Sequence, residues 1–78
     1  MNEYQKQIQE QSENYRFLLK AVTRKGFFEL YFKSLPYHRT NIECFNALND
    51  RYFDLVGEFR YSSYNSFRYQ LNKQEINQ

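Results

Sequence analysis

Apolar residues between positions 40 and 56 recur at intervals of three and four, which is the spacing of one face of a helix. The segment opens on Thr40, and Glu43 follows three positions later, which is the spacing of a capping box at a helix N-terminus. Gly57 comes directly after the segment, and glycine most easily adopts the left-handed conformation just past a helix end. The pattern predicts a helix over 40–56. Its expected inner face consists of Phe45, Leu48, Tyr52, Leu55 and Val56, widened by Phe53, with Asn49, Asp50 and Asp54 on the other side.

A second helix is predicted over 63–75, because three apolar residues there have the i, i+3, i+7 spacing of one helix face. Two serines precede this face, and serine is a good N-cap. A helix, a tight turn at Gly57 and a second helix form the outline of a helix-turn-helix, and equally that of any small helical hairpin. The apolar face is Tyr64, Phe67 and Leu71, and the candidate caps are Ser62 and Ser63.

The N-terminal part of the chain predicts one long helix over 2–25, since no glycine or proline occurs before Gly26 and good helix formers dominate. Apolar residues in it alternate by four and three, as in the seam of a coiled coil. Two interpretations stay open: a dimerisation arm, or a helix that packs on the domain through residues 17–22. The seam positions are Tyr4, Ile8, Gln11, Tyr15, Leu18 and Val22.

Gly26 interrupts this first helix after Arg24 and Lys25, which lie where cations favour a helix C-terminus; the helix either ends there or continues past a kink at Gly26. Residues 27–34 then form a short, almost entirely apolar segment, as expected of a buried helix, and Leu35-Pro36 ends it. No segment has the alternating pattern of a strand. The expected fold is therefore all-α, three or four helices with a C-terminal helix-turn-helix-like hairpin, in a single helical domain, 1–78, with a helical core at 27–75.

Composition adds little to this fold but limits the function. The chain has 78 residues, enough for one small domain, and its eight Phe and eight Tyr serve either a compact core or a partner surface. The net charge is +2, and residues 41–58 are acidic between basic flanks. Cys44 is the only cysteine, so a reducing compartment is expected, and it is read as a small buried residue. With no long apolar run and no apolar signal segment, we expect a cytoplasmic protein.

The residues needed for catalysis are not arranged in any recognisable set. His38 is the only histidine, and no Ser-His-Asp or Cys-His pairing follows from the spacing. Asp50 and Asp54 are one helical turn apart, which suits either a cation or an ordinary solvated face. There is no glycine-rich phosphate loop. We expect a protein that is not an enzyme and that uses no cofactor or metal.

The outer side of the last predicted helix has the chemistry of a nucleic-acid-recognition helix. Arginine and asparagine side chains pair with guanine and adenine edges, while serine and lysine bind phosphates. Arg24, Lys25 and Arg39 would add to this surface if the preceding helices fold against it. An ordinary polar surface is the alternative. The candidate binding residues are Arg60, Ser63, Asn65, Ser66, Arg68, Tyr69, Asn72 and Lys73.

The run from Arg60 to Arg68, RYSSYNSFR, together with residues 28–35 and 41–45, resembles a group of short uncharacterised proteins. These are helix-turn-helix-like helical proteins of Bacteroidetes and of their phages and mobile elements. The resemblance covers residues 27–73 and leaves out the polar N-terminal arm. It implies a helical-hairpin domain encoded near mobile DNA, and it implies no activity and no site residues. Small phage proteins of this size include both repressors and inhibitors of host defence.

These observations lead to three ranked expectations for function. The first is a small non-enzymatic protein that binds DNA or RNA, such as a phage or mobile-element transcriptional regulator, acting as a homodimer through the N-terminal helix. The alternative is a helical protein–protein interaction module, such as a phage-encoded inhibitor of a host enzyme or defence system. The third is a virion or assembly component. None of the three involves a membrane.

Overall fold

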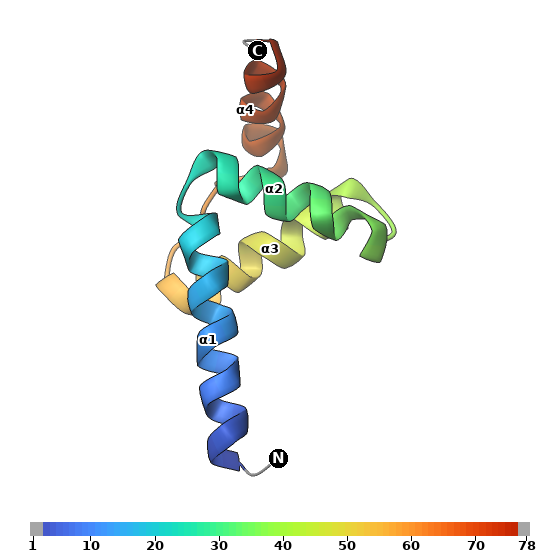
Figure 1. The fold of residues 1–78 in the computed structure, drawn as a ribbon. Helices are drawn as coiled ribbons and strands as arrows, with labels where there is room; N and C mark the ends of the chain where they lie inside the picture. Colours follow the sequence, from blue (N-terminus) through green and yellow to red (C-terminus); the bar gives the residue numbers. More distant parts are fainter. Residues whose placement is uncertain (1–2, 77–78) are drawn as a thin grey trace.

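The computed structural model of this protein describes the backbone of residues 3–76 and the side chains of residues 11–73. Within these residues the chain is all-helical and contains no strand, as the sequence predicts. The chain forms four α-helices and a short 3-10 turn, and Figure 1 shows how the helices are arranged. The elements are α1 (Glu3–Ala21), α2 (Arg24–Ser34), η1 (Leu35–Tyr37), α3 (Asn41–Val56) and α4 (Tyr64–Ile76).

The break between α1 and α2 comes earlier than the sequence predicts, so the single helix expected over 2–25 is wrong. Thr23 has extended backbone angles and accepts a hydrogen bond from the Gly26 N–H at 3.0 Å, which makes Thr23 the N-cap of α2. Gly26 lies inside the first turn of α2 and is buried. A Cβ there would collide with the main-chain carbonyl of Lys20. The glycine therefore permits the close approach of two helices, and Arg24 and Lys25 begin α2 instead of ending α1.

The predicted boundaries of α3 are confirmed at both ends. The Glu43 N–H donates a hydrogen bond of 3.1 Å to the Thr40 hydroxyl, so Thr40 is the N-cap. Gly57 has a φ of 91°, in the left-handed region, and its N–H donates to the Phe53 carbonyl at 2.8 Å. A side chain at position 57 would have this strained backbone conformation.

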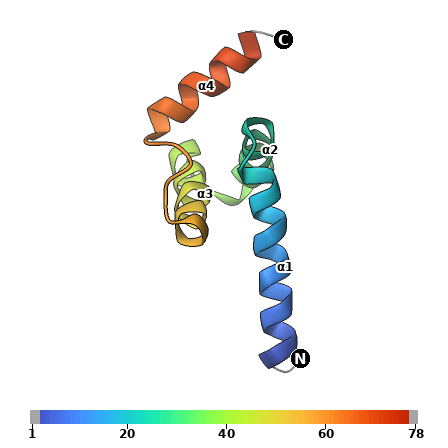
Figure 2. The ribbon, with the colours of Figure 1, turned by 90° about the vertical axis from the view of Figure 1, so that its left-hand side faces the viewer.

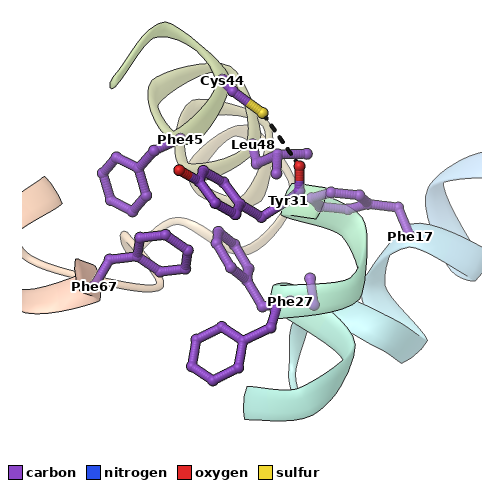
Figure 3. Close-up of a cluster of buried hydrophobic side chains, with 9 residues drawn as sticks. Phe17, Phe27, Tyr31, Cys44, Phe45, Leu48 and Phe67 are labelled. Carbon is purple, nitrogen blue, oxygen red and sulfur yellow. Dashed lines mark hydrogen bonds between the residues drawn. The ribbon is translucent and has the colours of Figure 1, made fainter. Parts of the chain in front are cut away.

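The core is a cluster of aromatic rings centred on Phe67. This side chain is fully buried, and Figure 3 shows it between rings from α2 and α3. Its ring centroid lies 4.8 Å from Tyr31, 5.0 Å from Phe45 and 5.5 Å from Phe27. Most of these pairs meet edge to face, the arrangement that aromatic quadrupoles favour. The predicted inner face of α4 is thus confirmed, with Phe67 at its centre and half-buried Tyr64 and Leu71 beside it.

The helix α1 packs on the domain through its C-terminal part. Phe17 and Ala21, one turn apart, are buried in the core. Two positions of the expected coiled-coil seam, Tyr15 and Val22, are instead 64% and 53% exposed, and Leu18 is half-buried. The side chains of Tyr4 and Ile8 lie outside the described residues. The packing interpretation of residues 17–22 accounts for these contacts, and dimerisation through α1 stays a prediction.

The predicted inner face of α3 is correct over its first half and wrong near its end. Phe45 and Leu48 are buried, and Tyr52 and Leu55 are half-buried. Three further positions differ from the prediction, because the 57–63 segment packs on the side of α3 that carries Asn49. Asn49 is buried, whereas Phe53 and Val56 are exposed.

The segment that joins α3 to α4 covers residues 57–63, one residue more than the predicted helices 40–56 and 63–75 leave between them, and one side chain fixes it. Asn49 Nδ2 donates to the Tyr61 carbonyl at 2.9 Å, and the Tyr61 N–H donates to Asn49 Oδ1 at 3.1 Å. Buried backbone polar groups need such partners when no helix or sheet supplies them. Asn49 is 6% exposed because it supplies both of them, which explains its inward position.

The four helices form an elongated molecule of 47 × 24 × 23 Å. Figure 1 and Figure 2 show α2 and α3 in the middle, with α1 and α4 extending away from them in opposite directions. Only the first part of α4 contacts the aromatic core, through Phe67 and its neighbours. The rest of α4 projects beyond the body of the protein (Figure 2), and this arrangement determines which of its side chains are accessible.

Candidate nucleic-acid interface

The helix α4 starts where two serines and the aromatic core fix it. The Ser66 N–H donates a hydrogen bond of 3.1 Å to the Ser63 hydroxyl, so Ser63 caps the helix. Phe67 then directs one side of the helix into the core. The hydroxyl of Ser63, one of the predicted binding residues, therefore has a structural role, although its side chain is exposed.

The other predicted residues of α4 are all exposed, and the helical repeat distributes them over three sides. Asn65, Tyr69 and Lys73, spaced by four residues, lie opposite the buried Phe67. The flanks on either side of this outer row are Arg68 with Asn72, and Ser66 with Gln70. The described side chains of α4, residues 64–73, include two cations and no carboxylate.

Arg68 lies near a pair of tyrosines at the edge of the core. Burial raises the pKa of Tyr31, and a hydrogen bond with Tyr64 raises it further, while the positive charge of Arg68 has a small lowering effect. Arg68, on one flank of the exposed side of α4, therefore lies close to the edge of the aromatic core. The guanidinium of Arg68 makes no ion pair with any carboxylate in the described part of the chain.

Arg60, predicted to contact phosphate, is half-buried and held in place by two contacts. Its Nε donates a hydrogen bond of 3.0 Å to the carbonyl of Ala21, the last residue of α1. Its guanidinium carbon lies 4.8 Å from the centre of the Tyr61 ring. Arg60 thus satisfies a carbonyl at the end of α1 and joins the 57–63 segment to that helix, with its charged group in a defined position.

A polar hollow of about 300 Å³ lies beside Arg60, and residues from three parts of the chain line it. Arg24 comes from the start of α2 and lines the same hollow. From the sequence, Arg24 is expected to join this surface if the preceding helices fold against it, and α2 does so. Lys25 and Arg39 do not line it. No carboxylate is among the lining residues, which are Arg24, Arg60, Tyr61, Ser62, Ser66 and Gln70.

Three of these lining residues were missed as site residues by the sequence reasoning. The sequence pattern presents Ser62 as a candidate helix cap and gives no role to Tyr61. Gln70 was not considered, although it follows Ser66 by one helical turn and must therefore share its side of α4. The hydroxyl oxygens of Ser62 and Ser66 are 3.2 Å apart, and Ser63 donates to Ser66 at 3.3 Å.

Tyr61 forms the apolar side of the hollow. Burial raises its pKa, and the positive charges of Arg60 and Arg24 act in the opposite direction. The Arg60 guanidinium carbon lies 4.8 Å from the Tyr61 ring centre, and Arg24 lines the same hollow as Tyr61. That hydroxyl is buried and has no hydrogen-bond partner among the groups that the structure describes.

The remaining candidates for chemistry do not form a site. Asp50 and Asp54 are exposed on α3, and the described side chains, residues 11–73, include no group of three His, Cys, Asp or Glu residues that could hold a metal ion. Cys44 is buried, its thiol donates to the Tyr31 carbonyl at 3.5 Å (Figure 3), and burial raises its pKa. This confirms Cys44 as a small buried residue. His38 is half-buried at the end of η1.

Among the described residues, no helix is both long enough and apolar enough to cross a membrane. The chain matches no protein-family model, no curated protein and no solved structure. The resemblance to helical proteins of Bacteroidetes and their phages therefore stays a prediction. What bears on function is the geometry of α4 and of the hollow beside it.

Proposed function

We propose that this protein is a small non-enzymatic nucleic-acid-binding protein whose α4 enters the major groove of a duplex. The observation that carries this proposal is the exposed side of α4, residues 64–73, which bears cations and amides and no carboxylate. The end of α4 also projects beyond the body of the protein (Figure 2), and the side of the helix opposite Phe67 is exposed.

The side chains on this surface suit both parts of nucleic-acid recognition. Asn65 and Arg68 lie near the start of α4, and an amide and a guanidinium pair with adenine and guanine edges. Lys73 lies on the same outer side two turns later and suits a backbone phosphate. In this proposal α3, the 57–63 segment and α4 act as a helix-turn-helix-like unit with a longer connection. A regulator of a phage or mobile element is the biological role that we propose for it.

The test is a titration of fluorescently labelled duplex DNA and duplex RNA with the full chain at two salt concentrations. Neutralised phosphates release counterions, so the affinity should fall steeply as salt rises. Genomic fragments give the sequence preference in the same assay. If neither duplex binds at low salt, where even non-specific attraction is strongest, the proposal is wrong.

A second candidate function rests on a different surface. Phe53 and Phe59 stack with ring centroids 4.5 Å apart, yet they are 41% and 51% exposed, and Val56 beside Phe53 on α3 is also exposed. An exposed aromatic pair of this kind suits a protein partner, as in a small helical interaction module. If the protein captures a host protein and no duplex, and replacing Phe59 with serine abolishes the capture, this function takes first place.

A further inference from the structure

The hollow beside α4 has the composition of an anion site. We infer that it holds one phosphate group of the bound nucleic acid, between the guanidinium groups of Arg24 and Arg60. This inference rests on the proposed function. It identifies one backbone phosphate that the protein binds beside α4. It places the contact in residues contributed by α2, the 57–63 segment and α4.

The charges in the hollow are uncompensated. Arg24 and Arg60 both line it, no carboxylate does, and neither guanidinium is ion-paired within the described part of the chain. Two like charges that share a small hollow repel each other, and an anion between them removes the repulsion. Arg60 uses its Nε for the Ala21 carbonyl, which leaves its terminal nitrogens to donate to an oxyanion.

Arg24 stands where the helix itself gains nothing from a cation. It is the first residue of α2, and the N-terminus of a helix carries a partial positive charge. Ser66, on the opposite side of the hollow, lies in the first turn of α4. Residues from the first turns of two helices therefore line the same hollow. A bound phosphate explains why a cation stands at position 24, whereas the stability of α2 does not explain it.

The hydroxyl groups complete the set of donors. Ser63 donates to Ser66, and the Ser66 and Ser62 hydroxyls are within hydrogen-bond distance of each other. With Ser66 donating to Ser62, the Ser62 hydroxyl is left to donate into the hollow that it lines. Hydrogen bonds in such a chain strengthen one another. Two guanidinium groups and a hydroxyl are the donors that bind phosphate oxygens in proteins.

A second basic hollow in the structure, of about 330 Å³, does not have these properties. Glu13 lines it, and two of its four cations, Lys20 and Arg51, have partners in the described part of the chain. The Arg51 guanidinium lies 4.4 Å from the Phe17 ring centre, and Lys20 pairs with Glu29 at 3.9 Å. The second hollow thus contains a carboxylate and an ion-paired lysine, whereas the first contains neither.

The first experiment measures thermal unfolding of the full chain in inorganic phosphate and in chloride at equal ionic strength. We expect the midpoint to rise with phosphate and to reach a plateau, because a ligand that binds only the folded state stabilises it. Arg24→Gln should abolish this rise, and Ser62→Ala should reduce it. Arg39→Gln removes the same charge from an exposed position outside the hollow and should leave the rise unchanged. An equal rise in Arg24→Gln overturns the inference.

The second experiment separates this inference from the proposed function. With duplex DNA, the slope of log affinity against log salt should be smaller in Arg24→Gln than in the wild type by about 0.9, the value for one lost phosphate contact. If the wild type binds duplex and Arg24→Gln binds with the same affinity and slope, the hollow is not a phosphate site and the proposed function stands. If no duplex binds but inorganic phosphate stabilises the protein through Arg24, the nucleic-acid origin of the phosphate is overturned, and a site for free phosphate takes its place.

Discussion

Asn49 on α3 holds the backbone of Tyr61 through two hydrogen bonds, one to each polar group of the same peptide residue. This contact fixes the middle of the 57–63 segment, and it therefore affects the residues just before and just after Tyr61. Arg60 directly precedes Tyr61 and reaches the end of α1, while α4 begins three residues after Tyr61. The buried amide of Asn49 therefore helps to position both the start of α4 and the Arg60 guanidinium of the hollow.

Replacing Asn49 with alanine should destabilise the fold strongly. Both backbone groups of Tyr61 would lose their partner, and each unsatisfied buried group costs ~1–3 kcal/mol. We expect the free energy of unfolding to fall by about 2–4 kcal/mol, measured by urea denaturation. Asn46→Ala removes an exposed asparagine from the same helix and should change it by less than about 0.5 kcal/mol. Equal effects of the two variants would show that the Asn49 contact does not stabilise the protein.

Phe67 should be the side chain whose loss damages the fold most. It is fully buried at the centre of the ring cluster, and Phe→Ala at such a site costs ~3–5 kcal/mol. That loss is enough to unfold a domain of this size, whose total stability is on the order of 5 kcal/mol. Circular dichroism and a urea titration measure it. Phe53→Ala is the control, because Phe53 is 41% exposed and should cost far less.

A folded Phe67→Ala protein with near wild-type stability would mean that α4 is not anchored by this ring. The exposed surface of α4 would then be assigned wrongly, because the position opposite Phe67 defines it. This outcome would also remove the structural basis for placing Asn65, Tyr69 and Lys73 on the outer side.

The sequence predicts most of the helices here because their signals are local. Thr40 with Glu43, Gly57, and the 64/67/71 stripe each act within one helical turn or at one helix end, and the structure confirms all three. Gly26 was misread because its role is not local. In a sequence, a glycine that allows another helix to approach cannot be told from a glycine that ends a helix. Only the position of the Lys20 carbonyl in the structure distinguishes the two roles.

The hollow was beyond sequence reasoning for the same reason. Arg24 and Arg60 are far apart in the chain, and nothing in their local sequence shows that they meet. Asn49 likewise appears as a polar residue on the outer side of a helix until the course of the 57–63 segment is known. Local patterns find elements and their ends, whereas sites made by irregular segments depend on how those segments fold back.

Alkaline pH should unfold the protein earlier than its composition suggests. Burial raises the pKa of Tyr61, Tyr31 and Cys44 in the folded state. A folded-state pKa above the unfolded value gives stability that is present at lower pH and is lost as pH rises through the folded pKa. The free energy of unfolding should therefore be constant near neutral pH and fall above about pH 9, where the unfolded-state thiol and phenols begin to ionise.

Tyr61→Phe isolates one contribution to this alkaline loss. The variant removes a buried hydroxyl without a partner among the described groups, so its stability at pH 7 should equal or exceed that of the wild type. The decline above about pH 9 should also become shallower, because one fewer phenol with a raised pKa remains. Tyr69→Phe, which removes the same hydroxyl from an exposed tyrosine, is the matched control. A steeper alkaline decline in Tyr61→Phe contradicts this explanation.

Removing the charge of Arg24 should stabilise the protein in the absence of any anion. A cation at a helix N-terminus is unfavourable by ~0.3–1 kcal/mol at low ionic strength, and Arg24→Gln removes it. The gain should shrink in high salt, where the interaction is screened. Urea denaturation at two sodium chloride concentrations measures both effects. A loss of stability in Arg24→Gln at low salt would show that the side chain serves the fold, and the phosphate hollow would lose one of its supports.

Variants in the outer row of α4 should distinguish phosphate contacts from base-edge contacts with a duplex. Lys73 lies two turns along the exposed side and is expected to bind a phosphate, so Lys73→Ala should weaken binding to every sequence by about the same factor and reduce the salt slope by about 1. Asn65 lies in the first turn, where side chains of a recognition helix reach base edges. Asn65→Ala should therefore relax the preference at one position of the site by ~1–3 kcal/mol and leave the salt slope unchanged.

The measurement is a set of anisotropy titrations against the preferred duplex and single-base variants of it, each at several salt concentrations. Asn46→Ala, on α3 and outside the proposed interface, is the matched control for the asparagine variant. The assignment of roles fails if Asn65→Ala weakens all sequences equally, because a base-edge contact must affect some sequences more than others. It also fails if Lys73→Ala alters sequence preference without changing the salt slope, since a phosphate contact carries charge and no information about the base.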